Sequence, residues 1–117
     1  MAKAAKKKPS VGKKIVDEAP VDLFTARSKE GVAYRLRMTR NVLGGNQRDF
    51  AAKAGLGSST YNQYETATTF PSLEEAHRLC DTYKLTLDWI FRGNASTLRR
   101  DVENALEALH QAKRTIE

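Results

Sequence analysis

Two side chains that can bind metal ions, His77 and Cys80, lie three positions apart, which places both on one face of a helix. A metal centre needs further ligands, and no second pair of this kind lies nearby in the sequence. The chain also shows no nucleophile–base–acid set and no glycine-rich loop of the type that cradles phosphate. We therefore expect no metal, no cofactor and no enzymatic activity, and we interpret Cys80 as a small core residue.

The spacing within residues 46–65, NQRDFAAKAGLGSSTYNQYE, is typical of two short helices that cross at a tight turn. Ala51 is the small residue needed where the helices approach, and Gly55, four residues later, tolerates the positive φ of the turn. Tyr61 and Tyr64, spaced by three, give the second helix an inward face. This pattern predicts a helix-turn-helix, whose second helix enters the major groove of DNA. The alternative is a plain pair of antiparallel helices in a bundle.

Capping residues and chain breaks predict the helices that position this unit. No segment alternates convincingly at period two, so we expect an all-α chain. The first helix should begin near Ser28 and end before Gly44 and Gly45, and later ones should span 47–54, 59–66, 73–83, 87–91 and 96–115. Asn46 and Thr86 are expected caps, as is either Gly57 or Ser58, and Ser72 with Glu75 forms a capping box. The expected inward residues are Val32, Leu36, Thr39, Leu43, Phe50, Ala51, Ala54, Tyr61, Tyr64, Leu73, Ala76, Leu79, Cys80, Tyr83 and Trp89.

The chain has 117 residues and a formal net charge of +6, which allows one domain with tails and suggests an acidic partner. Most of the excess lies in residues 1–30, which carry eight basic and four acidic side chains, against eight and six in residues 31–93 and four and four in residues 94–117. We predict that residues 1–30 form a basic, largely disordered arm and linker. The arm either lies on phosphates or only keeps the chain soluble.

The sequence lacks the features of membrane proteins and of secreted proteins. No run of the sequence is long and apolar enough for a transmembrane helix, and the basic N-terminus lacks the apolar stretch of a signal peptide. A single cysteine cannot form an intrachain disulfide. The sequence therefore predicts a soluble protein of a reducing compartment, with no membrane partner.

Residues 31–93 resemble the five-helix DNA-binding domain of the lambdoid-phage repressor and Cro proteins, also called the XRE family. The matching segments, in order and without gaps, are Leu43-Gly44, Asn46-Gln47, Phe50-Ala51, Gly55, Glu65, Pro71-Ser72-Leu73 and Leu87-Asp88-Trp89-Ile90. Gly45, Thr66 and Ala67 depart from the family pattern, in the loops that follow the first and third helices. The resemblance implies the family fold, with double-stranded DNA as the partner.

The resemblance also implies which residues contact DNA. The exposed residues of the third helix that would read base edges are Ser58, Ser59, Thr60, Asn62 and Gln63. An Asn or Gln can bond adenine N6 and N7 together, so Asn62 and Gln63 should supply most of the discrimination. The alternatives are a solvated face for these two and helix capping for one of Ser58 and Ser59.

Other family positions imply support for the recognition helix. Arg40 and Glu65 match an arginine–glutamate pair that fixes the angle of this helix, and Gln47 matches a residue that binds phosphate and buttresses the helix. The further candidates for phosphate contacts are Arg48, Lys53, Arg37, Arg35, Thr68 and Thr69. Each true phosphate contact should steepen the salt dependence of binding by about one unit.

The last helix carries an apolar seam with spacings of four and three, typical of a coiled coil. Its members are Leu98, Val102, Ala105, Leu109, Ala112 and Ile116, with Leu106 widening the seam. Because the family's domain is complete at Gly93, we expect residues 94–117 to join two copies into a homodimer. The alternative is a sixth helix that packs on its own domain, which needs the same apolar stripe. A dimer would present two recognition helices about 34 Å apart to a palindromic site.

The sequence thus predicts a cytoplasmic, nucleoid-associated regulator of transcription that binds double-stranded DNA as a dimeric repressor. Within the same class, an activator remains open, as does an antitoxin that acts with a protein partner. A protein-interaction module that has lost DNA binding is a rival from another class. An acidic or apolar recognition face would support it, and the polar face that comprises Ser58, Ser59, Asn62 and Gln63 argues against it. An enzyme subunit is a third rival, and it lacks any catalytic constellation.

Overall fold

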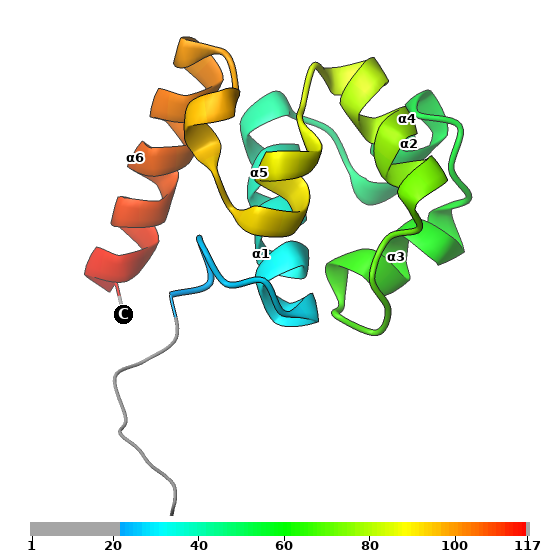
Figure 1. The fold of residues 1–117 in the computed structure, drawn as a ribbon, viewed down its shortest axis with the longest axis horizontal. Helices are drawn as coiled ribbons and strands as arrows, with labels where there is room; N and C mark the ends of the chain where they lie inside the picture. Colours follow the sequence, from blue (N-terminus) through cyan, green and yellow to red (C-terminus); the bar gives the residue numbers. More distant parts are fainter. Residues whose placement is uncertain (1–21, 117) are drawn as a thin grey trace, which may run out of the picture.

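The computed structural model describes the backbone of residues 22–116 and the side chains of residues 22–114. The predicted arm within residues 1–21 and the side chain of Ile116 lie outside this part. The described helices are α1 (Lys29–Leu43), α2 (Gln47–Lys53), α3 (Ser58–Glu65), α4 (Leu73–Tyr83), α5 (Leu87–Arg92), a short 3-10 helix η2 (Ala95–Thr97) and α6 (Arg100–Ile116). Residues 22–116 contain no strand, so the predicted all-α class is confirmed there. In Figure 1, α6 lies on one side of α1, and α2, α3 and α4 lie on the other.

Local capping explains where the helices begin. The side chains of four predicted caps, Ser28, Asn46, Ser72 and Thr86, each accept a hydrogen bond from the backbone N–H three residues later. The capping box is only half formed, because the Glu75 carboxylate accepts the hydroxyl of Tyr64 instead of reaching back to Ser72. The helix predicted at 96–115 is also corrected: η2 and a two-residue break precede α6, which begins at Arg100.

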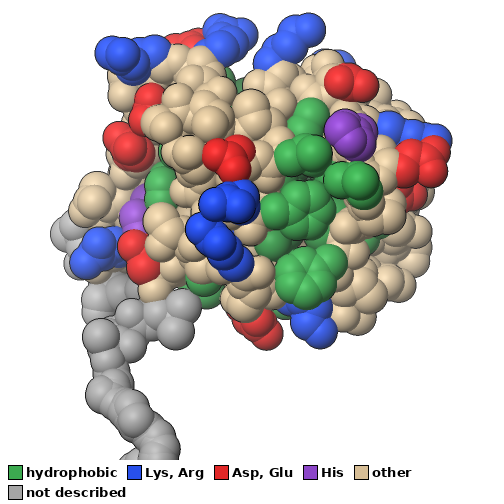
Figure 2. Space-filling model, in the orientation of Figure 1, with side chains coloured by type: hydrophobic (Ala, Val, Ile, Leu, Met, Phe, Trp, Pro, Cys, Tyr) green, Lys and Arg blue, Asp and Glu red, His purple; other side chains and the backbone are tan. Residues whose placement is uncertain are grey.

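Trp89 lies at the centre of the core and is fully buried. Its indole Nε1 donates to Thr39 Oγ1 at 3.0 Å, and the ring of Phe24 meets it edge-on at 5.1 Å. Two residues predicted to face inward do not: Leu43 is 37% exposed and Leu73 is 62% exposed. They are the last residue of α1 and the first of α4, where a helix end leaves a side chain with few neighbours. Figure 2 shows hydrophobic side chains gathered on one face, over α4 and α5.

Arg35, a sequence-based candidate for phosphate contact, is instead completely buried in α1. Its guanidinium donates to the carbonyls of Trp89 and Ile90 in α5 and to those of Leu23, Phe24 and Ala26, at 2.6–3.2 Å. Burial lowers the pKa of Arg35 to about 10, so the side chain stays charged at neutral pH. Arg35 therefore fastens residues 23–26 and the end of α5 to α1 and is unavailable to DNA.

Two glycines let residues 22–27 approach the helices this closely. A Cβ on Gly93 would lie 2.7 Å from the carbonyl oxygen of Phe24, and a Cβ on Gly31 would lie 2.1 Å from that of Ala26. Both distances are shorter than any tolerated contact, so these positions exclude side chains. Phe24, which the sequence placed in the linker before the first helix, is consequently part of the core.

The C-terminal helix packs on its own domain, which is the alternative and not the preferred prediction. Leu98 and Leu106 are buried in the same core as Trp89, and Val102 and Leu109 are half-buried against it. His110 strengthens this contact, because its Nδ1 lies 2.7 Å from the Tyr34 hydroxyl of α1. Ala105 is half-buried and Ala112 is exposed. Since Leu98 and Leu106 already fill the core, they are not free to form a seam with a second copy.

Candidate nucleic-acid interface

The pair α2 and α3 has the geometry that its residues predict. Ala51 is fully buried where the helices meet, and Gly55 in the turn has a φ of 77°. Leu56, also in the turn, is buried and donates its backbone N–H to the Ala51 carbonyl at 2.9 Å. The rings of Phe50 and Tyr61 lie 5.6 Å apart and join the two helices. The outer face of α3 is therefore held toward the solvent.

This outer face carries the side chains expected to read bases. All five are exposed: Ser58, Ser59, Thr60, Asn62 and Gln63. Within the described part of the chain, none of them uses its side chain in a hydrogen bond or an ion pair. On the opposite face, Tyr61 and Tyr64 are buried as predicted. The outer face of α3 is thus polar, uncharged and open to a partner.

The predicted capping role of Ser58 or Ser59 is wrong. Gly57, one of the two residues expected to cap α3, is its N-cap, but glycine has no side chain with which to form a cap. Ser58 is already the first residue of the helix. Both hydroxyls therefore remain available. The first turn of α3 contains no acidic residue, so the exposed N–H groups at this end keep their partial positive charge.

An ion pair fixes the other end of α3 to α1. Arg40 Nε lies 2.8 Å from Glu65 Oε2, and Arg40 Nη2 lies 2.9 Å from Glu65 Oε1, which is a two-point contact. Gln47 of α2 donates to the same carboxylate at 2.9 Å. Arg37 of α1 donates to the backbone carbonyl of Glu65 at 2.6 Å. Residues of two other helices therefore converge on the last residue of α3.

Arg40 and Glu65 are both charged at neutral pH. Burial alone would raise the pKa of Glu65, but the hydrogen bond from Arg40, with the nearby Tyr61 hydroxyl and Gln47, lowers it below its ordinary value. The bond to Glu65 raises the pKa of Arg40. Burial, followed by the neighbouring Glu65 carboxylate, raises the pKa of Tyr61. The pair thus consists of a guanidinium and a carboxylate that lies almost wholly out of water, with 1% of its side chain exposed.

The candidates for phosphate contact come from three elements around α3. Arg48 and Lys53 of α2 are exposed, and Thr68 is exposed in the loop after α3. Arg37 is exposed as well, although one of its nitrogens is bound to Glu65. Gln47 is half-buried and is held by Glu65, so it braces α3 whether or not it also reaches a phosphate.

Sequence reasoning missed two contacts that hold the helix-turn-helix from behind. Arg78 of α4 donates to the carbonyl of Gly55 in the turn at 3.1 Å, and the Tyr83 hydroxyl donates to the carbonyl of Phe50 at 2.7 Å. Both partners are backbone carbonyls more than 20 residues away, so no spacing rule relates them. Aromatic stacking of Tyr83 on Phe50, with ring centroids 4.0 Å apart, had no sequence signal either.

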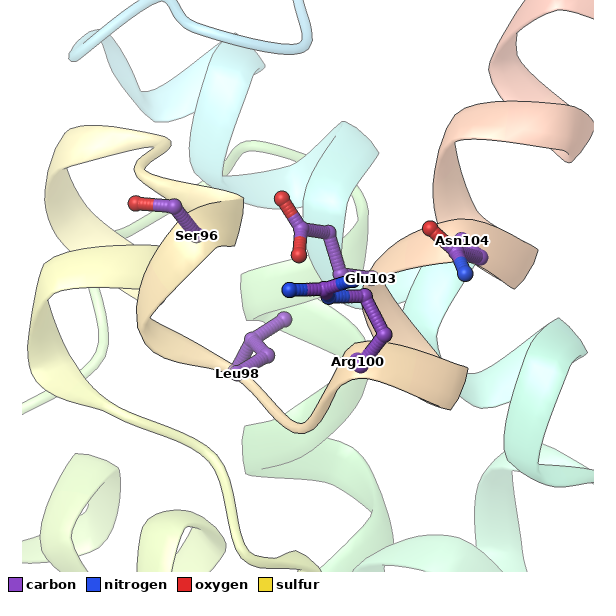
Figure 3. Close-up of a pocket in the computed structure, with 5 residues that line it drawn as sticks. All are labelled: Ser96, Leu98, Arg100, Glu103 and Asn104. Carbon is purple, nitrogen blue, oxygen red and sulfur yellow. The ribbon is translucent and has the colours of Figure 1, made fainter.

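The pair His77 and Cys80 does not form a metal site in the described part of the chain. His77 is exposed and Cys80 is half-buried, and no group of three His, Cys, Asp or Glu residues in the described part of the chain could hold a metal ion. Burial raises the pKa of the Cys80 thiol, which keeps it protonated. An open hollow where η2 meets α6 is lined by Ser96, Leu98, Arg100, Glu103 and Asn104 (Figure 3). It lies on the α6 side of α1, away from α3 (Figure 1).

Comparison with protein families gives one match, to the family described as helix-turn-helix, over residues 36–90. This span begins within α1 and ends within α5, and it contains α2, α3 and α4 entire. The comparisons with curated proteins and with solved structures gave no match. Among the described residues, no helix is long and apolar enough to cross a membrane.

Proposed function

The chain belongs, through residues 36–90, to the helix-turn-helix family of DNA-binding transcription regulators of the repressor and Cro type, and from this premise we propose that it reads a specific operator sequence through α3. In this proposal α3 enters the major groove of double-stranded DNA, and the domain acts as a repressor. The observation that carries the proposal is the outer face of α3, whose five polar side chains are exposed and uncommitted.

The chemistry of that face suits base recognition. The amides of Asn62 and Gln63 each offer a donor and an acceptor side by side, which matches the N6 and N7 edge of adenine. The hydroxyls of Ser58, Ser59 and Thr60 are shorter and can donate or accept, so they tolerate several bases. The charges that would supply affinity are on Arg48 and Lys53, two exposed residues of α2. Sequence discrimination and electrostatic attraction are thus assigned to different residues.

The support of α3 favours a fixed reading angle. Arg40, Gln47 and Arg37 all bind Glu65 at the end of α3, so the helix is already positioned before it meets DNA. A positioned helix loses less conformational freedom on binding, which preserves more of the gain from each base contact.

Two copies on a palindromic operator would supply the specificity that one copy lacks. A well-formed base contact contributes about 1–3 kcal/mol of discrimination, whereas specific binding usually exceeds non-specific binding by about 4–10 kcal/mol. With two amide side chains on its α3, one copy reaches the lower end of this range only. We therefore propose two half-sites about one helical turn apart.

The domain organisation supports repression by occupancy. Residues 22–114 share one core, and Phe24, Trp89 and Leu106 all belong to it. The described residues form no separate domain that could bind an inducer. The protein would then block access to a promoter by occupying the operator.

Binding to a library of genomic fragments at several salt concentrations tests the proposal. We expect Asn62→Ala and Gln63→Ala each to weaken binding to the selected sequence by about 1–3 kcal/mol and to relax its specificity. We expect Arg48→Ala to weaken binding to all sequences alike and to reduce the salt slope by about one unit.

Asn104→Ala is the matched control, because Asn104 is an exposed amide on α6, on the far side of α1. It should leave affinity and specificity unchanged. The proposal is wrong if Asn62→Ala and Gln63→Ala select the same sequences as the wild type with the same affinity.

A further inference from the structure

The helix α4 holds each part of the helix-turn-helix with a different side chain. Near its start, Glu75 accepts a hydrogen bond from the hydroxyl of Tyr64 in α3. At its centre, Arg78 donates to the carbonyl of Gly55 in the turn, at 3.1 Å. At its last residue, the Tyr83 hydroxyl donates to a backbone carbonyl of α2, at 2.7 Å. The backbones of α3 and α4 make little direct contact, so side chains carry the connection between these two helices.

Glu75 bonds to α3 in preference to a bond within its own helix. Ser72 and Glu75 stand at the spacing of a capping box, in which the carboxylate would accept from the backbone N–H of Ser72. Half of that box is present, because the Ser72 hydroxyl accepts from the backbone N–H of Glu75 at 3.1 Å. The carboxylate meets Tyr64 instead. The structure therefore has a contact between two helices where the sequence offers a local one.

The Tyr64 side chain is fixed on the inner face of α3. It is 4% exposed, and the ring of Tyr61 meets it edge-on, with the ring centroids 6.4 Å apart. Burial, followed by the hydrogen bond to Glu75, raises the pKa of the Tyr64 hydroxyl. The hydroxyl therefore keeps its proton at neutral pH and remains a donor to the carboxylate.

Tyr64 and Glu65 restrain α3 in two different directions. Successive residues of an α-helix point about 100° apart around the helix axis. Glu65 is held by α1 and α2, through Arg40 and Gln47, and Tyr64 is held by α4. One tethered side chain leaves a helix able to turn about its own axis. Two that point in different directions oppose this rotation.

We propose that Tyr64, through its hydrogen bond to Glu75, is a positioning residue that sets the rotation of α3 and thereby determines which bases the protein prefers. The proposal rests on the proposed function and deepens it. Asn62 and Gln63 directly precede Tyr64, so a rotation of α3 moves both. A binding constellation works only within about 0.5 Å and 10–20° of its productive geometry. Loss of the Tyr64 hydroxyl should therefore lower discrimination between bases without removing any group that touches DNA.

The test measures binding of the full chain to three kinds of DNA: the sequence that the wild type selects from a library, copies of it with single base-pair changes, and random-sequence DNA. Tyr64→Phe removes the hydroxyl and keeps the ring that fills the core. We expect it to reduce discrimination against the changed copies on the order of fivefold. Its affinity for random-sequence DNA and its salt slope should equal those of the wild type, because Arg48 and Lys53 are unchanged.

Two further comparisons separate positioning from a general loss of structure. If Tyr64 acts through Asn62 and Gln63, Tyr64→Phe should cause no further loss of discrimination in a variant that already carries Asn62→Ala and Gln63→Ala. Glu75→Gln keeps an oxygen that accepts from Tyr64 and should discriminate like the wild type, whereas Glu75→Ala should match Tyr64→Phe. This pair also isolates the hydrogen bond from the negative charge, which both substitutions remove.

Tyr34→Phe is the matched control. It also removes one hydroxyl from a ring, and that hydroxyl is bonded to His110 of α6, on the side of α1 away from α3. We expect Tyr34→Phe to lower the melting temperature by several degrees and to leave discrimination between bases unchanged. A loss of discrimination in this variant as well would show that any loosening of the fold has this effect, and would overturn the specific role of Tyr64.

The outcomes distinguish this proposal from the proposed function. If Tyr64→Phe discriminates like the wild type, or if its loss persists in full beside Asn62→Ala and Gln63→Ala, the positioning role is overturned and the proposed function stands. Equal discrimination by Glu75→Gln and Glu75→Ala overturns it too, and these two variants decide alone should Tyr64→Phe fail to fold. A wild type that selects no sequence overturns both proposals.

Discussion

The two sides of α1 use its arginines in different ways. Toward α3, Arg40 is paired with the Glu65 carboxylate and Arg37 binds the carbonyl of the same residue. Toward α5 and residues 22–27, Arg35 is completely buried, and its guanidinium donates to backbone carbonyls and lies over the ring of Trp89. The first side fixes one helix from its end, and the second fastens two chain segments into the core.

This difference explains how the fold leaves the outer face of α3 free of intramolecular contacts among the described residues. A two-point ion pair at the end of α3 sets its position without using its outer face, so Asn62 and Gln63 remain exposed. On the other side, Phe24 and Leu106 are buried in the core and are not available to a partner. We call the side of α1 that holds α3, the proposed recognition helix, the recognition side, and we call the opposite side the supporting side.

The largest effect should come from the supporting side. Arg35→Met removes every guanidinium donor while keeping a long side chain, and it takes away the donor to the carbonyls of Phe24 and Ile90 in the buried hydrogen bonds. We expect the free energy of unfolding, measured by urea denaturation, to fall by about 3 kcal/mol or more. A loss below about 1 kcal/mol would show that the carbonyls are satisfied in another way, and the contrast with Arg40 would fail.

A smaller effect, with a pH signature, should come from the recognition side. Glu65→Gln leaves the Arg40 guanidinium without its counter-charge, and we expect the free energy of unfolding at pH 7 to fall by about 2 kcal/mol. The pKa of Glu65 is lowered in the fold, so its stabilisation is complete above the ordinary value of 4.5 and is lost as the pH falls through the lowered value. Denaturation between pH 6 and pH 2 should show this loss in the wild type and not in the variant.

Glu74→Gln provides the control for that experiment. Glu74 pairs with Arg78 on the surface, where the carboxylate side chain is 77% exposed, so the pair contributes little. Its removal should leave both the stability and its pH dependence close to those of the wild type. If Glu74→Gln and Glu65→Gln behaved alike, the special role of the buried pair would be refuted.

The smallest effect should be a gain in stability. Ala67, just after α3, has a φ of 62°, a left-handed conformation that costs a residue with a Cβ about 1–2 kcal/mol. Ala67→Gly should relieve this and raise the free energy of unfolding by up to about 1 kcal/mol, after the greater chain entropy of glycine is deducted. Lys84→Gly, at a φ of 59° after α4, should give a similar gain, and neither should alter the selected DNA sequence. A loss of stability in both would contradict the strain argument.

Much of the recognition side could be predicted from the sequence because its signals are local. The caps Ser28, Asn46 and Ser72 each accept a hydrogen bond from a backbone N–H three residues later. Ala51 and Gly55 are the small residues required at a single turn, where Gly55 has a positive φ. The family pattern also indicated the Arg40–Glu65 pair, which no spacing rule would have found.

The supporting side was harder to predict because its contacts join distant segments. Arg35 looks in the sequence like any cation of a DNA-binding chain, and only the carbonyls of residues 23–26 and of α5 explain its burial. The seam of α6 was read correctly as apolar, but a stripe that includes Leu106 fits its own domain as well as a second copy. Leu73 follows the helical pattern and is still exposed, since periodicity says nothing about where neighbouring helices end.

The fastening of residues 22–27 bears on how such a unit can be moved between proteins. The span that carries the family pattern, residues 36–90, omits the Ser28 cap, Arg35, Phe24 and Leu106. A chimaeric protein that received residues 36–90 alone would contain α3. It would lack the residues that complete the core around it, including Phe24, whose ring meets Trp89 edge-on. The segment that matches the family and the segment that folds as one unit therefore have different boundaries. An exchange of specificity between relatives is better made by replacing the outer residues of α3 than by exchanging the segment.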